Sequence, residues 1–128
     1  MERKNLNVIE TTLLLQLKGI ENSEEAESVF DMLIRPKFNV VEHIYKEYEN
    51  GGLSHVCLLE ESTLAMHYYP EYMIMTVIIS SCENEGEVFE KFRSIIAEVM
   101  YLYETTYQIM QFTPVGLQAI DSKYDILY

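Results

Sequence analysis

Ser62, His67 and Cys82 carry side chains that could together break a peptide bond and build a reactive carbonyl. Ser62 follows Glu61 at the end of an apolar run, and His67 and Cys82 follow it in the chain. A serine hydroxyl can attack the carbonyl of the preceding residue and convert the peptide bond into an ester, provided that a donor stabilises the oxyanion. If a base then removes the serine α-proton, the ester eliminates. The upstream chain leaves with a new carboxyl end, and the remaining dehydroalanine hydrolyses to a pyruvoyl group.

Each of these residues also has a simpler structural interpretation. A serine at the end of a strand usually has no chemical role, and a single histidine is more often a surface or hydrogen-bonded core residue. A cysteine before a polar stretch can be a small buried hydrophobe. An imidazole a few residues downstream nevertheless suits the removal of the serine α-proton, because its pKa lies near neutrality.

Residues 52–71 resemble the processing region of the short prokaryotic S-adenosylmethionine decarboxylases. The family pattern is Gly-x-Ser, an apolar strand, Glu-Ser-His-Leu-Ser-x-His-x-Trp-Pro-Glu, and then a strand that ends in Cys. The chain matches this pattern at Ser54, Ser62, His67, Pro70, Glu71 and Cys82. It is this combination at the family's spacing that favours chemistry over the structural interpretations.

The resemblance implies cleavage between Glu61 and Ser62, which gives a β chain of residues 1–61 and an α chain of residues 62–128. Ser62 then becomes the pyruvoyl cofactor. The family assigns self-processing to the residue matched by His67, with hydrogen-bonding help from the one matched by Ser54. It assigns to the match of Cys82 the proton returned to the substrate after carbon dioxide leaves. Cys57 lies within an apolar run and is expected only to pack.

The resemblance also implies a set of substrate contacts. Tyr48 and Tyr69 match the aromatic pair that sandwiches the adenine ring of S-adenosylmethionine, with tyrosine in place of the family's tryptophan at position 69, and Glu71 matches the acid that binds the ribose hydroxyls. The chain departs from the pattern around this pocket, for example at Thr63, where the family has histidine. Three functions therefore stay open. The first is decarboxylation of S-adenosylmethionine for spermidine synthesis, the second is the same chemistry on ornithine or arginine, and the third is an unprocessed homologue that binds or regulates a partner.

Composition limits the setting of this chemistry. The chain has 128 residues and is expected to form one domain, and its formal charge is -12, from 21 acidic and 9 basic residues. This charge disfavours a nucleic-acid partner and is compatible with a cationic substrate, although it is also common in cytosolic proteins. No apolar stretch approaches the length of a membrane span, so a cytoplasmic protein without membrane contact is expected. The spacing of the three histidines and two cysteines predicts no metal site.

The hydrophobic pattern predicts the elements that would position these residues. Strands are expected over residues 8–17, 39–48, 54–59, 73–79 and 107–112, and helices over 23–34 and 88–103. No pattern is evident in the tail after residue 115. The order predicts an α+β two-layer sandwich, with a largely antiparallel sheet and its helices on one face.

One strand in this scheme points to a second subunit. Residues 73–79 are apolar on both sides, so a small monomer would leave a large apolar patch in water. We therefore expect a homodimer in which two sheets stack as αββα. The resemblance implies the same assembly, with active sites where the subunits meet.

Overall fold

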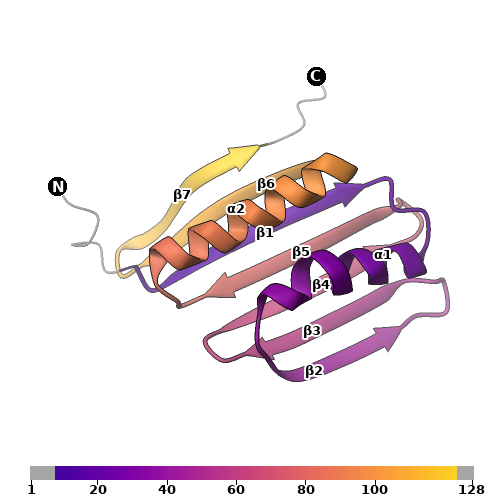
Figure 1. Cartoon of the computed structure of the whole chain (residues 1–128), viewed down its shortest axis with the longest axis horizontal. Helices are drawn as coiled ribbons and strands as arrows, with labels where there is room; N and C mark the ends of the chain where they lie inside the picture. Colours follow the sequence, from indigo (N-terminus) through magenta and orange to yellow (C-terminus); the bar gives the residue numbers. More distant parts are fainter. Residues whose placement is uncertain (1–7, 124–128) are drawn as a thin grey trace.

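The computed structural model describes residues 8–123, which form one sheet with its helices on a single face (Figure 1). The strands are β1 (Glu10–Lys18), β2 (Val40–Glu47), β3 (Leu53–Leu59), β4 (Ser62–Tyr69), β5 (Ile74–Ser81), β6 (Glu104–Thr113) and β7 (Gly116–Lys123). The helices are α1 (Ser23–Val29), which continues into the turns Phe30–Ile34 and Arg35–Lys37, and α2 (Glu85–Leu102). The predicted α+β sandwich with helices on one face is confirmed.

The sheet has seven strands in the order β2-β3-β4-β5-β1-β6-β7, and all neighbours are antiparallel. Helix α2 lies over β1 and β6, and α1 lies over the half of the sheet that contains β3 and β4 (Figure 1). Both helices begin at asparagine caps. The Asn22 side chain accepts from the Glu25 N–H at 2.8 Å, and the Asn84 side chain accepts from the Gly86 N–H at 2.9 Å.

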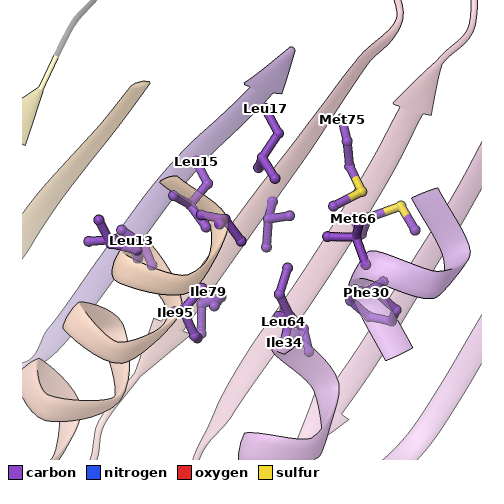
Figure 2. Packing of buried hydrophobic residues seen from close by; sticks show 14 of the residues in the cluster. Leu13, Leu15, Leu17, Phe30, Ile34, Leu64, Met66, Met75, Ile79 and Ile95 are labelled. Carbon is purple, nitrogen blue, oxygen red and sulfur yellow. The ribbon is translucent and has the colours of Figure 1, made fainter. Parts of the chain in front are cut away.

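The hydrophobic core lies between the sheet and the two helices. Every second residue of a strand faces it, because side chains alternate across a sheet. Figure 2 shows the side chains of β1, β4 and β5 converging on those of the helices, namely Leu13, Leu15, Leu17, Leu64, Met66, Met75 and Ile79 with Phe30, Ile34 and Ile95. This packing fixes which residues of each strand point to the helices and which point to the opposite face.

Strand β4 was not predicted from the sequence, although it places most of the candidate residues. Leu64, Met66 and Tyr68 alternate inward along it, and Thr63 and His67 point to the opposite face. The hydroxyl and imidazole side chains between the apolar positions weaken its strand pattern. β7 was also missed, because it is an edge strand whose exposed residues carry little pattern and whose pairing with β6 shifts register between Ile109 and Met110.

The face of the sheet opposite the helices carries exposed apolar side chains. Val56, Leu58 and Ile78 point to this face and are 43%, 50% and 43% exposed. No helix among residues 8–123 covers this face (Figure 1). We refer to it below as the open face. Within the described part of the chain, no helix has the length and apolar character needed to cross a membrane.

Candidate active site

The bend between β3 and β4 contains the bond that the sequence marks for cleavage. Glu60 and Glu61 form this bend, and Ser62 is the first residue of β4. The Cys82 N–H donates to the Glu61 carbonyl oxygen at 3.0 Å. The carbonyl that Ser62 would attack therefore already contacts a backbone donor, as an oxyanion would require.

The two cysteines lie in different surroundings. Cys82 follows the last residue of β5 and is exposed, whereas Cys57 is buried in the core, and both are free thiols. Burial raises the pKa of the Cys57 thiol. The position of Cys57 agrees with a packing role, and that of Cys82 leaves its thiol accessible beside the Glu61–Ser62 bend.

A second group of candidate residues lies on the open face. Ser54 on β3 and His67 on β4 are cross-strand partners, and the Ser54 hydroxyl lies 2.7 Å from His67 Nδ1. The Tyr48 hydroxyl lies 3.4 Å from the Ser54 hydroxyl oxygen. The sequence placed Ser54 and His67 in the same reaction, and the structure brings their side chains into contact.

This second group lines an open cavity of about 450 Å³. Its walls include Tyr48, Ser54, His67, Tyr69 and Glu71, which are the residues expected to bind substrate or assist processing. The two tyrosines present aromatic surfaces, and Glu71 supplies a carboxylate that can accept hydrogen bonds. The cavity could therefore hold a flat ring that carries hydroxyl groups.

The two groups lie at opposite ends of β4. Ser62 and His67 are five residues apart, which is about 16 Å along a strand. They also face opposite sides, since Ser62 pairs with Ser81, whose side chain is buried under the helices, and His67 points to the open face. Within one chain, His67 does not lie close enough to take the α-proton of Ser62. The sequence suggested proximity because the strand between them was not predicted.

Comparison with known proteins identifies the family. The family model of S-adenosylmethionine decarboxylase matches residues 15–111, which include both groups of candidate residues. The chain belongs to the S-adenosylmethionine decarboxylase family. As a member of this family it is an enzyme that decarboxylates S-adenosylmethionine. No curated protein matches its sequence significantly.

A solved structure shows the same fold. The crystal structure of the adenosylmethionine decarboxylase from Aquifex aeolicus superposes with a TM-score of 0.60 at 17% sequence identity. The match covers 80% of this chain and 88% of the other chain. The two proteins therefore share the α+β fold over most of their length.

Sequence reasoning missed two charged residues beside the bend of this decarboxylase. Glu83 and Lys91 line a small cavity of about 50 Å³ together with Glu61 and Ser62. Lys91 Nζ lies 3.0 and 3.3 Å from the two carboxylate oxygens of Glu83. No linear pattern indicates this pair, because the start of α2 separates the two residues.

The sequence also did not predict a chain of hydrogen bonds that links β2, β3 and α1. His43 Nε2 lies 2.5 Å from His55 Nδ1, and His55 Nε2 contacts the Glu27 carboxylate. His55 is buried, and its ring lies 4.9 Å from that of Phe30 and 4.8 Å from that of His43, centroid to centroid. Among residues 8–123, no group of three or more potential metal ligands comes together.

Proposed function

We propose that this decarboxylase matures by cleaving its own chain between Glu61 and Ser62 and then works through the pyruvoyl group that Ser62 becomes. The observation that carries the proposal is the hydrogen bond from the Cys82 N–H to the Glu61 carbonyl, directly beside Ser62. A carbonyl in a bend, held by a backbone donor and followed by serine, is arranged for conversion into an ester.

The processing steps balance without an outside oxidant. The Ser62 hydroxyl oxygen adds to the Glu61 carbonyl carbon, the C–N bond breaks, and the Ser62 nitrogen takes up the proton that the hydroxyl loses and becomes a free amine. A base then removes the Ser62 α-proton, and the Cβ–O bond of the ester breaks so that Glu61 leaves as a carboxylate. Water hydrolyses the remaining dehydroalanine, releases its nitrogen as ammonia and leaves the pyruvoyl group.

The residues around the bend fit that group. The pyruvoyl group supplies a carbonyl that captures the substrate amine and draws electrons as carbon dioxide leaves. Cys82 is exposed next to the bend, so its thiol can deliver a proton to the substrate α-carbon. In a homodimer, Tyr48, Tyr69 and Glu71 of the partner subunit would bind the adenosyl part of the substrate.

The substrate that best fits the cavity is S-adenosylmethionine rather than ornithine or arginine. Tyr48 and Tyr69 offer stacking surfaces, and neither alternative substrate carries an aromatic ring to fill them. The decarboxylated product would serve as the aminopropyl donor for spermidine synthesis.

We also infer that the working enzyme is a homodimer. Ser62 and His67 are too far apart in one chain, and His67 lies on the open face together with the exposed apolar residues Val56 and Ile78. Stacking two open faces as αββα would cover this apolar surface. It would also allow the partner subunit's His67 to reach the bend, where Glu61 and Cys82 are exposed.

Intact-mass analysis of the purified protein tests the proposal. We expect two fragments divided at Glu61–Ser62, with the α chain carrying the mass of a pyruvoyl end and reacting with phenylhydrazine. The processed protein should release carbon dioxide from S-adenosylmethionine and not from ornithine or arginine. A single full-length species after long incubation would instead support an unprocessed homologue that binds or regulates a partner.

A further inference from the structure

The segment that follows β5 is held by a side-chain network that the processing chemistry does not itself use. Ser81, whose side chain is buried, accepts from the Glu83 N–H at 3.1 Å, and its hydroxyl donates to the Glu83 carboxylate at 3.1 Å. Lys91 on α2 donates to both oxygens of the same carboxylate, at 3.0 and 3.3 Å. These contacts restrain the residues on either side of Cys82, namely Ser81 and Glu83.

The same network reaches the bond to be cleaved. The Cys82 N–H, which the network flanks on both sides, is the group that donates to the Glu61 carbonyl oxygen at 3.0 Å. Glu83 and Lys91 also line the small cavity that Glu61 and Ser62 border. Lys91 is itself fixed on its other side, since its ammonium lies 5.2 Å from the centre of the Phe38 ring.

The ion pair of Lys91 and Glu83 contributes more by holding the Glu83 side chain in place than by its electrostatic attraction. The side chains of Lys91 and Glu83 are 33% and 21% exposed, so water screens much of their attraction. A carboxylate that accepts from a hydroxyl and an ammonium nevertheless has little freedom to rotate. Serine attack on a carbonyl depends steeply on alignment, because a misplacement of about 1 Å can slow a reaction roughly 100-fold.

We propose that Glu83 and Lys91 are positioning residues for self-processing, which hold the Cys82 N–H against the Glu61 carbonyl and so set the attack of Ser62. The proposal rests on the proposed cleavage at Glu61–Ser62. It assigns the pair to the first step, ester formation, and gives it no contact with substrate.

The test compares cleavage rates of Lys91→Met and Glu83→Ala with those of a matched control. Lys37→Met is the control, because Lys37 forms a similar ion pair with Glu98 on the same helix, at 2.8 Å, and does not line the cavity beside Ser62. We expect both test variants to process roughly 10- to 100-fold more slowly than the wild type, and Lys37→Met to process at the wild-type rate. Lys91→Arg keeps the ion pair and should restore most of the rate.

Two further readouts separate positioning from general loss of structure. Thermal unfolding should change no more in Lys91→Met than in Lys37→Met, and the double variant Lys91→Met with Glu83→Ala should process no more slowly than the slower single variant, because both residues act through one contact. Hydroxylamine cleaves esters, so it should not restore cleavage in Lys91→Met if ester formation is the impaired step.

Three results would overturn the inference. The first is equal processing by wild type, Lys91→Met and Lys37→Met, and the second is a slow Lys91→Met whose unfolding temperature falls well below that of Lys37→Met. The third is full rescue of Lys91→Met by hydroxylamine, which would place the pair in the later elimination. A wild-type chain that never cleaves would overturn the proposed function itself, and the inference with it.

Discussion

Cys82 contributes two chemically different groups to the site, and the structure separates them. Its backbone N–H donates to the Glu61 carbonyl, while its thiol is exposed and makes no part of that hydrogen bond. Processing would use the backbone group, and decarboxylation would use the thiol. The side chain of Cys82 can therefore be removed without removing the donor that processing needs.

This separation predicts different outcomes for Ser62→Ala and Cys82→Ala. Ser62→Ala should abolish both cleavage and decarboxylation, because it removes the nucleophile and the source of the pyruvoyl group. Cys82→Ala retains the backbone N–H, so it should cleave within a few-fold of the wild-type rate, yet decarboxylate roughly 100-fold or more slowly for lack of the proton donor. Intact mass and carbon dioxide release measure the two steps. Equal loss of cleavage in both variants would show that the thiol is needed for processing.

At the scale of elements, the hairpin of β2 and β3 forms one wall of the cavity proposed to bind substrate. Tyr48 and Ser54 flank its turn, and Gly52 lies within the turn with its backbone packed closely. A Cβ at Gly52 would lie 3.0 Å from the Asn50 side-chain oxygen and 3.3 Å from the Tyr68 carbonyl oxygen. The turn and the cavity wall therefore depend on glycine at this position.

Gly52→Ala should accordingly weaken both the hairpin and substrate binding. We expect a loss of about 1 to 3 kcal/mol in the free energy of unfolding, because the Tyr68 backbone cannot move without disturbing β4, and a higher KM for S-adenosylmethionine. Gly86→Ala is the control, since its Cβ would meet only the Asn84 side chain at 3.3 Å. An unchanged KM in Gly52→Ala would show that the turn does not shape the cavity.

A histidine on the edge strand β2 contacts a side chain of the neighbouring strand β3. His43 stacks on His55 with ring centroids 4.8 Å apart, and its neighbours include Arg35, Asp31 and Glu27 as well as His55. Loss of water on the stacked side, followed by the charges of His55 and Arg35, lowers the pKa of His43 below its ordinary value of 6.5, and Asp31 and Glu27 oppose this only in part. The folded state therefore resists protonation of His43.

The direction of this pKa shift predicts a loss of stability on acidification. Between pH 6.5 and the lowered pKa, the unfolded chain binds more protons than the folded chain, so the free energy of unfolding falls as the pH falls through this window. Urea unfolding at pH 7.5 and pH 5.5 should show a smaller loss for His43→Gln than for the wild type. An identical loss in the two proteins would contradict the prediction.

At the scale of the whole molecule, the chain carries two groups of candidate residues that do not meet. The bend with Ser62 lies at one end of β4, and the Ser54–His67 pair lies at the other end on the open face. A homodimer with stacked open faces would join one group from each chain. The active site would then be a property of the pair of chains.

Mixed dimers test this arrangement directly. Chains with Ser62→Ala and chains with His67→Ala should each fail to cleave alone, but the His67→Ala chain should cleave when the two are expressed together. In that pair it keeps its own Ser62 and receives His67 of the partner subunit. A mixture of Ser54→Ala and His67→Ala is the control, because each chain lacks a member of the same group and no complete site forms. Absence of cleavage in the first mixture would show that processing does not use His67 across the interface.

The sequence by itself predicted the α+β class and the apolar stripe of α2, because these follow from residue type and local periodicity, and its resemblance to the family named the candidate reactive residues. It also indicated an uncovered apolar face, since residues 73–79 are apolar on both sides. Only the tertiary structure decided that Ser54 meets His67, that both lie at the other end of β4 from Ser62, and that Glu83 and Lys91 line the cavity beside the Glu61–Ser62 bend. These contacts depend on the register between strands and on where a helix docks. Contacts between residues distant in the chain are set by the packing of the whole core, so no local sequence pattern predicts them.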